Sequence, residues 1–380
     1  FAAISGLAIA WPLLARCWLV MVCTMIDEAK PLRRRWTTGA CATAALRAAM
    51  LELWRGERVP TVKITLPRGE RPEFAVAHRD SGPGWAEAGI IKDAGDDPDV
   101  THGAMIIVRV SETAVGGIRF LAGDGVGTVT RPGLPIAPGE PAINPVPRQM
   151  MQAVVADLAQ REGRAPSVDI TVSIPGGRDI AEKTWNPRLG ILGGLSVLGT
   201  TGIVRPFSCA AWIASIHRGI DVARAVGLTH VAGCTGATSE KAVQELCGLP
   251  DIAMLDMGDF YGGMVKYLRR HPVGKVTIGG GLGKLTKLAQ GAVDLHSGRS
   301  TVDFPALAQA LGQPQRMAGR PGDHFDIAGA STVLEVYENM GGPLVDWITN
   351  AAREQVQAML PDACIDIVAV DRAGRVVGRA

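Results

Sequence analysis

The first half of the chain combines short strand-type patterns with two helix-type stretches. Polar and apolar residues alternate, or form short apolar runs, in four segments that predict strands of a partly exposed sheet: Thr61–Leu66, Glu73–Ala77, Ala104–Val110 and Ser167–Ile174. Helical spacing predicts one helix over Ala40–Leu53, with Thr37 or Thr38 as its N-cap, and another over Gln149–Gln160. Between them, Pro132 to Pro147 holds six prolines, which predicts a long irregular loop.

Beyond about residue 189, strand and helix patterns take turns. Strands are expected at Thr229–Ala232, Ile252–Leu255 and Lys275–Ile278, and helices at Glu240–Cys247, 262–270 and Lys284–Gln290. Strands alternating with helices at this spacing predict a wound parallel sheet. The tail predicts two helices, at about 326–339 and 343–359, and a hairpin of Ile365–Val370 with Arg375–Arg379.

These patterns predict an α/β and α+β chain of 380 residues, long enough for two domains. We expect a mixed-sheet N-terminal domain over 31–188 and a Rossmann-like wound parallel-sheet domain over 189–325. Residues 326–380 are expected to pack back on the first domain. Residues 1–30 are strongly apolar up to Val22, whereas Met25 opens an ordinary polar start. We therefore expect an over-extended or disordered N-terminus, with translation beginning at Met25.

Charge and cysteine content narrow the class of protein. The net charge is only +2 and aromatic residues make up 5%, so we expect no nucleic-acid partner. The apolar N-terminal stretch is interrupted by Pro12 and Arg16, which disfavours a membrane span. Seven scattered cysteines without a CxxC pair favour a reducing cytoplasm and no cysteine zinc site, and we expect no protein metal ligand.

An unusual cluster of acids precedes the apolar run at residue 104. It consists of Asp93, Asp96, Asp97, Asp99 and His102. Acids this close repel one another unless they are used or screened. The spacing does not match a calcium loop. Two interpretations stay open: the cluster supplies a general base or a substrate-binding carboxylate, or it is a turn capped by aspartates before Pro98.

Several glycine-rich turns could admit a ligand. Gly123 to Thr130 follows a G-x-G-x-G pattern, for which a simple glycine hairpin is the alternative. The turn after the strand at 229–232, the end of the next strand and Gly279 to Gly283 would meet at one edge of a wound sheet, where nucleotide-like cofactors bind. The cofactor candidates are Gly233, Thr235, Gly236, Ser239, Glu240, Asp256, Gly280 and Gly281.

Eight segments together resemble one family. They read TTGACA (37–42), KDAGDDPDVT (92–101), GVGTVT (125–130), PAINPVP (141–147), IPGG (174–177), KTWNPRLG (183–190), LGTTGIV (198–204) and GMVK (263–266). On these motifs the chain resembles the cobalt-precorrin-5B C1-methyltransferases of the CbiD type. The resemblance runs from about Leu32 into the stretch 294–303.

The resemblance implies S-adenosylmethionine as methyl donor, a cobalt corrinoid as substrate and partner, and a cytoplasmic enzyme of anaerobic cobalamin synthesis. Cobalt would enter only with the substrate. Self-association into a homodimer is left open. A flat macrocycle fringed with carboxylates needs cations, N–H donors and close backbone approach. The expected substrate-binding residues are Thr37, Thr38, Gly39, Gly125, Gly127, Arg131, Arg188 and Arg205, and the expected catalytic residues are Asp93, Asp96, Asp97, Asp99 and His102. The alternatives are a non-catalytic corrinoid carrier and a nucleotide- or phosphate-using α/β enzyme.

Overall fold

The computed structural model describes residues 31–312 and 325–380. The expected over-extended N-terminus at 1–30 lies outside the described residues. In the first half of the chain the helices are α2 (Thr38–Arg55), α3 (Pro145–Glu162) and α4 (Gly177–Ala181). The strands are β1 (Arg35–Trp36), β2 (Thr61–Lys63), β3 (Glu73–Ala75), β4 (His78–Gly82), β5 (Trp85–Ile91), β6 (Met105–Glu112), β7 (Ile118–Ala122), β8 (Thr128–Val129), β9 (Val168–Ser173), β10 (Ile191–Leu192) and β11 (Ile203–Val204).

A five-stranded sheet with the order β4-β5-β6-β9-β7 forms the centre of this half. Its strands are antiparallel except that β7 and β9 run parallel, so the expected mixed sheet is confirmed. Helices α2 and α3 pack on one face and bury alternate side chains of β6, including Ile106, Val108 and Val110. Charged side chains such as Glu87 and Arg109 pair on the open face. This division between a covered and a solvated face is usual for antiparallel sheets.

Helix α2 is longer than the predicted 40–53 because both ends are capped. Thr37 is the N-cap, as predicted, and its hydroxyl accepts a hydrogen bond from the Ala40 N–H at 3.2 Å. Gly56 closes the other end in a left-handed conformation, with φ of 69°. Alanines on the buried faces of the helix let it lie close to the sheet and to α3.

The proline-rich loop ends earlier than expected. The prediction placed Pro132 to Pro147 in one irregular stretch, but α3 already begins at Pro145. A proline in the first turn of a helix costs little, because the N–H groups of that turn have no carbonyl acceptor within the helix. The loop therefore ends at Asn144, the N-cap of α3.

The second half contains the helices α5 (Cys209–Ala225), α6 (Ala237–Cys247), α7 (Tyr261–Leu268), α8 (Leu282–Ala289), α9 (Phe304–Leu311), α10 (Val333–Met340) and α11 (Gly342–Met359), and the short 3-10 turn η1 (Asp251–Ala253). Its strands are β12 (His230–Cys234), β13 (Met254–Leu255), β14 (Lys275–Gly281), β15 (Cys364–Val370) and β16 (Val376–Arg379). They form one sheet with the order β13-β12-β14-β15-β16.

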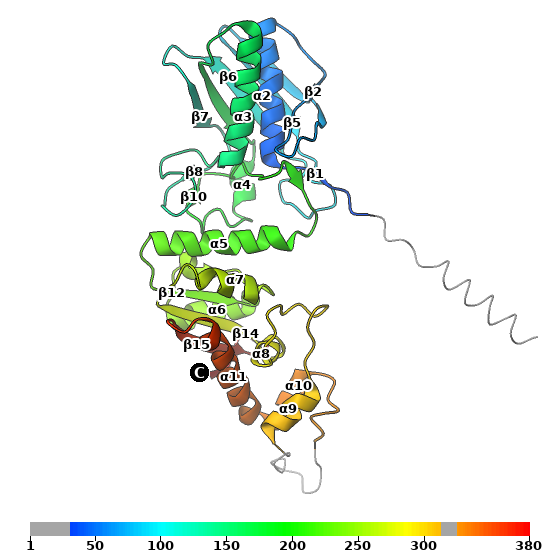
Figure 1. The fold of residues 1–380 in the computed structure, drawn as a ribbon, viewed down its shortest axis with the longest axis vertical. Coiled ribbons are helices and arrows are strands. Elements are labelled where there is room, and N and C mark those ends of the chain that lie inside the picture. The colour runs from blue at the N-terminus through cyan, green and yellow to red at the C-terminus, as the bar shows by residue number, and fades with distance from the viewer. Residues whose placement is uncertain (1–30, 313–324) are drawn as a thin grey trace, which may run out of the picture.

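Strands β13, β12, β14 and β15 run parallel, which confirms the predicted parallel pairing of the three βα strands. Strand β16 closes the sheet antiparallel to β15 as the predicted hairpin, with Gly374 at φ of 84° in its turn. Helices α5, α7, α8 and α11 contribute to one buried cluster on one face. Helix α6 packs on the other face, against Ala232 and Val368. In Figure 1, α5 lies across the molecule between the two sheets.

Three expectations about this half are wrong. The C-terminal segment does not pack on the first domain, because β15 pairs with β14 along its whole length and α11 packs against α8 and β15. Strand β15 of this segment therefore adds its apolar residues to the parallel sheet and not to the mixed sheet. Residues Gly279 to Gly281 are not a loop but the end of β14, paired with Val368 to Val370. The first tail helix begins at Val333 rather than at 326.

Candidate functional site

The carboxyl ends of three parallel strands gather at one edge of the second sheet. Strand β12 ends at Cys234 and turns through Thr235 and Gly236 into α6. Strand β13 ends at Leu255 and leads through Asp256 and Gly258 to α7, and β14 passes directly into α8. We call this set of turns the carboxyl edge. Ligands of parallel sheets bind at such edges, where helix N-termini present free N–H groups.

The glycines of the carboxyl edge have two different surroundings. A Cβ at Gly233 would lie 2.5 Å from Met264 Sδ, and a Cβ at Gly280 would lie 2.9 Å from Thr235 Oγ1. The space beside these two glycines is therefore occupied by the protein's own side chains. A Cβ at Gly236 or Gly283 would meet nothing within 4 Å. The open space of this edge thus lies over Gly236 and Gly283, and at Gly281 the nearest atom is the Val370 carbonyl oxygen at 4.0 Å.

Arg188, Glu240 and Asp256 form one group of charged side chains at the carboxyl edge. Arg188, from the loop after α4, pairs with Glu240 in the first turn of α6 at 2.6 Å. Burial and the nearby Glu240 charge raise the pKa of Asp256, and the Arg188 guanidinium lowers it only in part. The Asp256 side chain accepts no hydrogen bond from the described residues, whereas its backbone carbonyl accepts the Trp212 indole N–H at 2.8 Å. Asp256 is therefore a carboxylate with free acceptor atoms at the end of β13.

Hydrogen bonds hold the turns of this edge in place. The Ser239 hydroxyl donates to the Gly236 carbonyl at 2.8 Å, and the Thr235 N–H donates to the Gly279 carbonyl at 2.9 Å. Lys284 Nζ donates to the Thr235 carbonyl at 3.2 Å and lies 2.7 Å from Asp259 Oδ1, off the angle of a hydrogen bond. These hydrogen bonds fix the turns of the carboxyl edge. Of the residues predicted to bind the cofactor, Ser239 uses its hydroxyl to stabilise the turn at Gly236.

The acid cluster forms a loop whose carboxylates are mostly occupied by neighbours. Asp93 Oδ2 accepts from Arg35 Nε at 3.1 Å and from Arg33 at 3.2 Å, and Asp93 Oδ1 accepts the Gly95 N–H. Burial opposes ionisation of Asp93, but these hydrogen bonds and charges lower its pKa. Asp96 accepts the Arg33 backbone N–H at 2.6 Å. These two aspartates tie the loop to the strand that precedes α2.

Asp99 belongs to a buried ion pair. Its Oδ2 binds Lys92 Nζ, and its Oδ1 accepts hydrogen bonds from the Thr101 N–H at 2.8 Å and hydroxyl at 2.6 Å. The Lys92 side chain is only 1% exposed. Burial raises the pKa of Asp99, but the Lys92 charge and the hydrogen bonds outweigh it, so the net pKa is lowered. A carboxylate held in this way is a weak base.

The remaining two members of the acid cluster differ from these. His102 Nδ1 accepts the Ala94 N–H at 3.1 Å, which leaves the Nε2 atom of a half-exposed ring as a donor. Asp97 Oδ1 accepts the Phe207 N–H at 2.9 Å, and Asp97 forms no ion pair within the described residues. Asp97 is thus the aspartate of the cluster with an oxygen that no described residue engages.

The expected N–H donors at the start of α2 bind protein atoms. The Gly39 N–H donates to the Leu198 carbonyl at 2.9 Å, and Thr37 Oγ1 accepts the Ala40 N–H. A Cβ at Gly39 would lie 2.6 Å from the Pro147 ring, and Thr38 is 4% exposed. Motif segments 37–42, 141–147 and 198–204 therefore come together here as one packed junction.

Gly125 and Gly127 likewise contact the protein's own backbone. A Cβ at Gly125 would lie 1.9 Å from the Ile174 carbonyl oxygen, and one at Gly127 would lie 2.8 Å from the Gly194 carbonyl oxygen. Arg131 lies across Gly190, where a Cβ would be 2.8 Å from Arg131 Cδ. Arg188 is used in the Glu240 ion pair, and Arg205 is exposed beside β11. The structure does not bring the expected substrate residues into a single cluster.

Three residues, two at the start of α5 and one beneath the acid cluster, were not singled out from the sequence. Phe207 and Trp212 are 66% and 45% exposed around the start of α5, and Lys92 is buried beneath the acid loop. A signal for the first two existed: an aromatic residue directly before the Ser208 N-cap and another at the fourth helical position are the spacing of a hydrophobic staple. For Lys92, its place beside four aspartates gave no sign of burial.

The two buried cysteines at helix starts are poor nucleophiles. Burial raises the pKa of Cys41 to about 12 and that of Cys234 to about 12. A thiol with such a pKa is protonated at neutral pH. Both side chains are less than 2% exposed and fill space in the cores.

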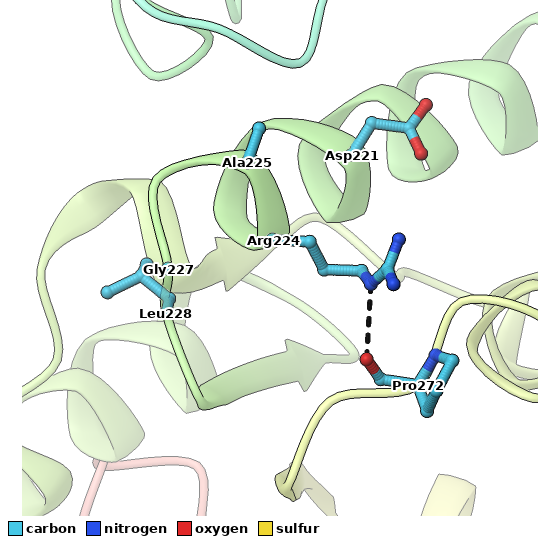
Figure 2. A pocket seen from close by; sticks show the side chains of 6 residues that line it. All are labelled: Asp221, Arg224, Ala225, Gly227, Leu228 and Pro272. Atoms are coloured by element: carbon cyan, nitrogen blue, oxygen red, sulfur yellow. Dashed lines mark hydrogen bonds between the residues drawn. The ribbon is translucent and has the colours of Figure 1, made fainter.

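A surface hollow of about 370 Å³ lies at the opposite end of the parallel strands from the carboxyl edge. Figure 2 shows it between the end of α5 and the turns at Leu228 and Pro272, which precede β12 and β14. It therefore lies at the amino ends of the parallel strands. Arg224 reaches across it and donates to the Pro272 carbonyl at 3.1 Å.

Known proteins that resemble the chain match it over nearly its whole length. The family model CbiD matches residues 25–206. The cobalt-precorrin-5B C(1)-methyltransferase of Bradyrhizobium sp. strain BTAi1 is 57% identical over 357 residues, which cover 92% of this chain and 94% of that protein. This chain belongs to the CbiD family. A second family member of that name, from Paramagnetospirillum magneticum, is 56% identical and covers 94% of this chain and 100% of its own length.

A solved CbiD structure also resembles the chain. The cobalamin biosynthesis protein (cbiD) from Archaeoglobus fulgidus is 28% identical, covers 66% of this chain and 78% of its own, and superposes with a TM-score of 0.38. In the CbiD-family chain described above, none of the helices within 31–312 and 325–380 has the length and apolar character needed to cross a membrane.

Proposed function

We propose that this chain transfers the methyl group of S-adenosylmethionine to C1 of cobalt-precorrin-5B, which gives cobalt-precorrin-6A in anaerobic cobalamin synthesis. One observation carries the proposal: relatives named for this activity share more than half of their residues with the chain over nearly the full length of both proteins. The proposed site of action is the cytoplasm.

The proposed cofactor site is the carboxyl edge, with the second sheet acting as a Rossmann-like nucleotide-binding unit. Support comes from the open space over Gly236 and Gly283 and from the free carboxylate of Asp256 at the end of the neighbouring strand. A ribose offers hydroxyl donors, and an aspartate in this position accepts them. When bound, S-adenosylmethionine supplies an electrophilic methyl group on a sulfonium, so positioning dominates catalysis. Because Glu240 is paired with Arg188, Asp256 is the carboxylate of this group that is left to attract the sulfonium.

The proposed proton acceptor is Asp97. Asp93 and Asp99 have lowered pKa values and are held by cations, whereas Asp97 is held only by the Phe207 N–H. Asp97→Asn keeps an oxygen for that N–H, so folding should be retained while turnover falls strongly. If the methylation rate stays within about threefold, which is less than about 1 kcal/mol, Asp97 has a structural role.

The proposed activity is tested by incubating the purified chain with S-adenosylmethionine and cobalt-precorrin-5B and following the product mass. A gain of one methyl group per corrinoid is expected. Calorimetry with S-adenosylhomocysteine separates the enzyme from a corrinoid carrier, because a carrier has no use for this ligand. Absence of binding even with corrinoid present would contradict the methyltransferase.

The cofactor edge is tested by a pair of glycine variants. Gly236→Ala places a methyl group in the open space of the edge, and its φ of 170° is accessible to any residue. We expect normal stability and a loss of S-adenosylhomocysteine affinity of about tenfold or more. Gly342→Ala, at the start of α11, also meets nothing within 4 Å and is the matched control. Equal affinities in both variants would place the cofactor elsewhere.

A further inference from the structure

Phe207 is held in a costly backbone conformation. Its φ of 54° is the only positive value of a non-glycine residue within 31–312 and 325–380. Bulky residues rarely adopt this region, and such strain gathers at functional sites. Asp97 stabilises the conformation by accepting the Phe207 N–H at 2.9 Å, across 110 positions of the sequence. The result is a phenyl ring that is 66% exposed where a hydrophobic staple would bury it.

Trp212 is a second exposed aromatic residue at the same helix start, and it is held rigidly. Its indole N–H donates to the Asp256 carbonyl at 2.8 Å, and its ring packs at 5.8 Å against Phe260. It is nevertheless 45% exposed. A ring fixed on one side and bare on the other is suited to contact a flat ligand. Its anchor, Asp256, belongs to the proposed cofactor edge, so the exposed ring borders that site.

Two exposed arginines adjoin the same end of the β1–β11 pair, close to Phe207. Strands β1 and β11 pair antiparallel with Arg35 opposite Val204, and Arg34 and Arg205 are the next residues beyond that pair, where the Arg34 backbone bridges to Gly95. Both are exposed, and neither forms an ion pair with a described residue, unlike the neighbouring Arg33 and Arg35, which pair with Asp93. Like charges at one end of a strand pair repel each other. A carboxylate bound there would reduce that repulsion and could accept hydrogen bonds from both guanidinium groups.

We propose that Phe207 and Trp212 contact the face of the tetrapyrrole, while Arg34 and Arg205 bind one of its peripheral carboxylates. This inference rests on the proposed function and names the substrate subsite. Its occupant must be flat, conjugated and anionic at its rim, which the corrinoid substrate is. The subsite borders Asp97 through Phe207 and the cofactor edge through Trp212.

The test measures binding of two stable cobalt corrinoids by equilibrium dialysis: cobyrinic acid, with free carboxylates, and cobinamide, in which side chains are amides. Phe207→Gly removes the ring and relieves the φ strain. We expect its Kd for cobyrinic acid to rise about tenfold or more, with a melting temperature no lower than that of the parent. Phe207→Trp keeps a ring and should stay within about threefold.

The arginine pair is tested by the double variant Arg34→Gln with Arg205→Gln. We expect about tenfold or more weaker binding of cobyrinic acid and little change for cobinamide. Arg353→Gln, an exposed arginine of α11, is the matched control. If Phe207→Gly binds cobyrinic acid as the parent does, or if the double variant weakens both corrinoids equally, the subsite is wrong. Failure of the parent protein to bind S-adenosylhomocysteine would instead contradict the proposed methyltransferase activity. The corrinoid-binding measurements would still decide whether the subsite exists.

Discussion

At the scale of single residues, the glycine-rich motif serves the fold. Gly125, Gly177 and Gly194 come from three separate segments, and a Cβ on Gly177 or Gly194 would lie 2.4 Å or 2.3 Å from the Gly125 carbonyl oxygen. The three backbones cross more closely than any side chain allows. From the sequence, the G-x-G-x-G pattern left a ligand contact or a simple glycine hairpin open, whereas these positions contain a crossing of backbone segments.

Replacing Gly125 should therefore be among the most damaging single changes. Gly125→Ala combines a positive φ of 70° with a Cβ 1.9 Å from the Ile174 carbonyl oxygen. We expect a loss of more than about 4 kcal/mol in the free energy of unfolding, or no soluble protein. Gly139→Ala, with φ of 90° and nothing within 4 Å, isolates the backbone strain and should cost only about 1–2 kcal/mol. Urea unfolding of both variants measures the difference, and equal losses would refute the crossing.

The buried pair of Lys92 and Asp99 predicts a pH dependence of stability. Because the pKa of Asp99 is lowered in the folded chain, its contribution is complete above the unfolded aspartate pKa and disappears as the pH falls through the folded value. Asp99→Asn leaves Lys92 charged and buried, and should cost roughly 3 kcal/mol at pH 7. Its stability should also fall less steeply below the ordinary aspartate value of 3.8. Parallel acid-limb slopes in urea titrations of both proteins would contradict the pairing.

At the scale of elements, the sequence patterns predicted several parts whose apolar residues face a core along their whole length, although β5, which also does so, was not predicted. The strands at 104–110 and 167–174, the helix after Thr37 and the final hairpin are of this kind. Helix α5 escaped prediction because its buried residues begin only at Ile216, and its first half faces outward. The carboxyl edge could be predicted because it is formed where the parallel strands end, and these strands themselves were predicted from their apolar residues. The roles of the acid loop were not, since burial of Lys92 and the reach of Asp97 to Phe207 depend on tertiary contacts.

The ion pair between α6 and the loop after α4 predicts opposite shifts in a pH profile. Glu240 raises the pKa of Asp256 and Arg188 lowers it. If ionised Asp256 binds the cofactor, affinity falls as the pH drops through that pKa. Arg188→Gln should move this acid limb to higher pH, and Glu240→Gln should move it to lower pH. The measurement is the Kd for S-adenosylhomocysteine between neutral and acidic pH, and shifts in the same direction would exclude Asp256 as the acceptor.

At the scale of the whole molecule, the largest buried clusters divide between the two sheets. One is built from α2, α3 and the mixed sheet, and the other from α5, α7, α8, α11 and the parallel sheet. Figure 1 shows these parts following one another along the long axis. Each cluster contains enough apolar side chains to unfold as its own unit.

Calorimetry should show this division. We expect two unfolding transitions, of which S-adenosylhomocysteine raises only the one that belongs to the parallel sheet. At a ligand concentration of about 100 times the Kd, the stabilisation should be about 2.7 kcal/mol. A fragment of residues 25–206 serves as a reference for the other transition. An equal shift of both transitions would mean that the two sheets unfold together.

The position of β15 also sets the order in which the molecule can be made. This strand, formed by residues 364–370, lies between β14 and β16, so the parallel sheet stays incomplete until these residues have been synthesised. The mixed sheet needs nothing beyond β9 and its helices and can fold while the ribosome is still translating. Until then, β14 presents an unpaired apolar edge to the cell. Premature termination ahead of β15 should therefore produce aggregation rather than a shortened enzyme.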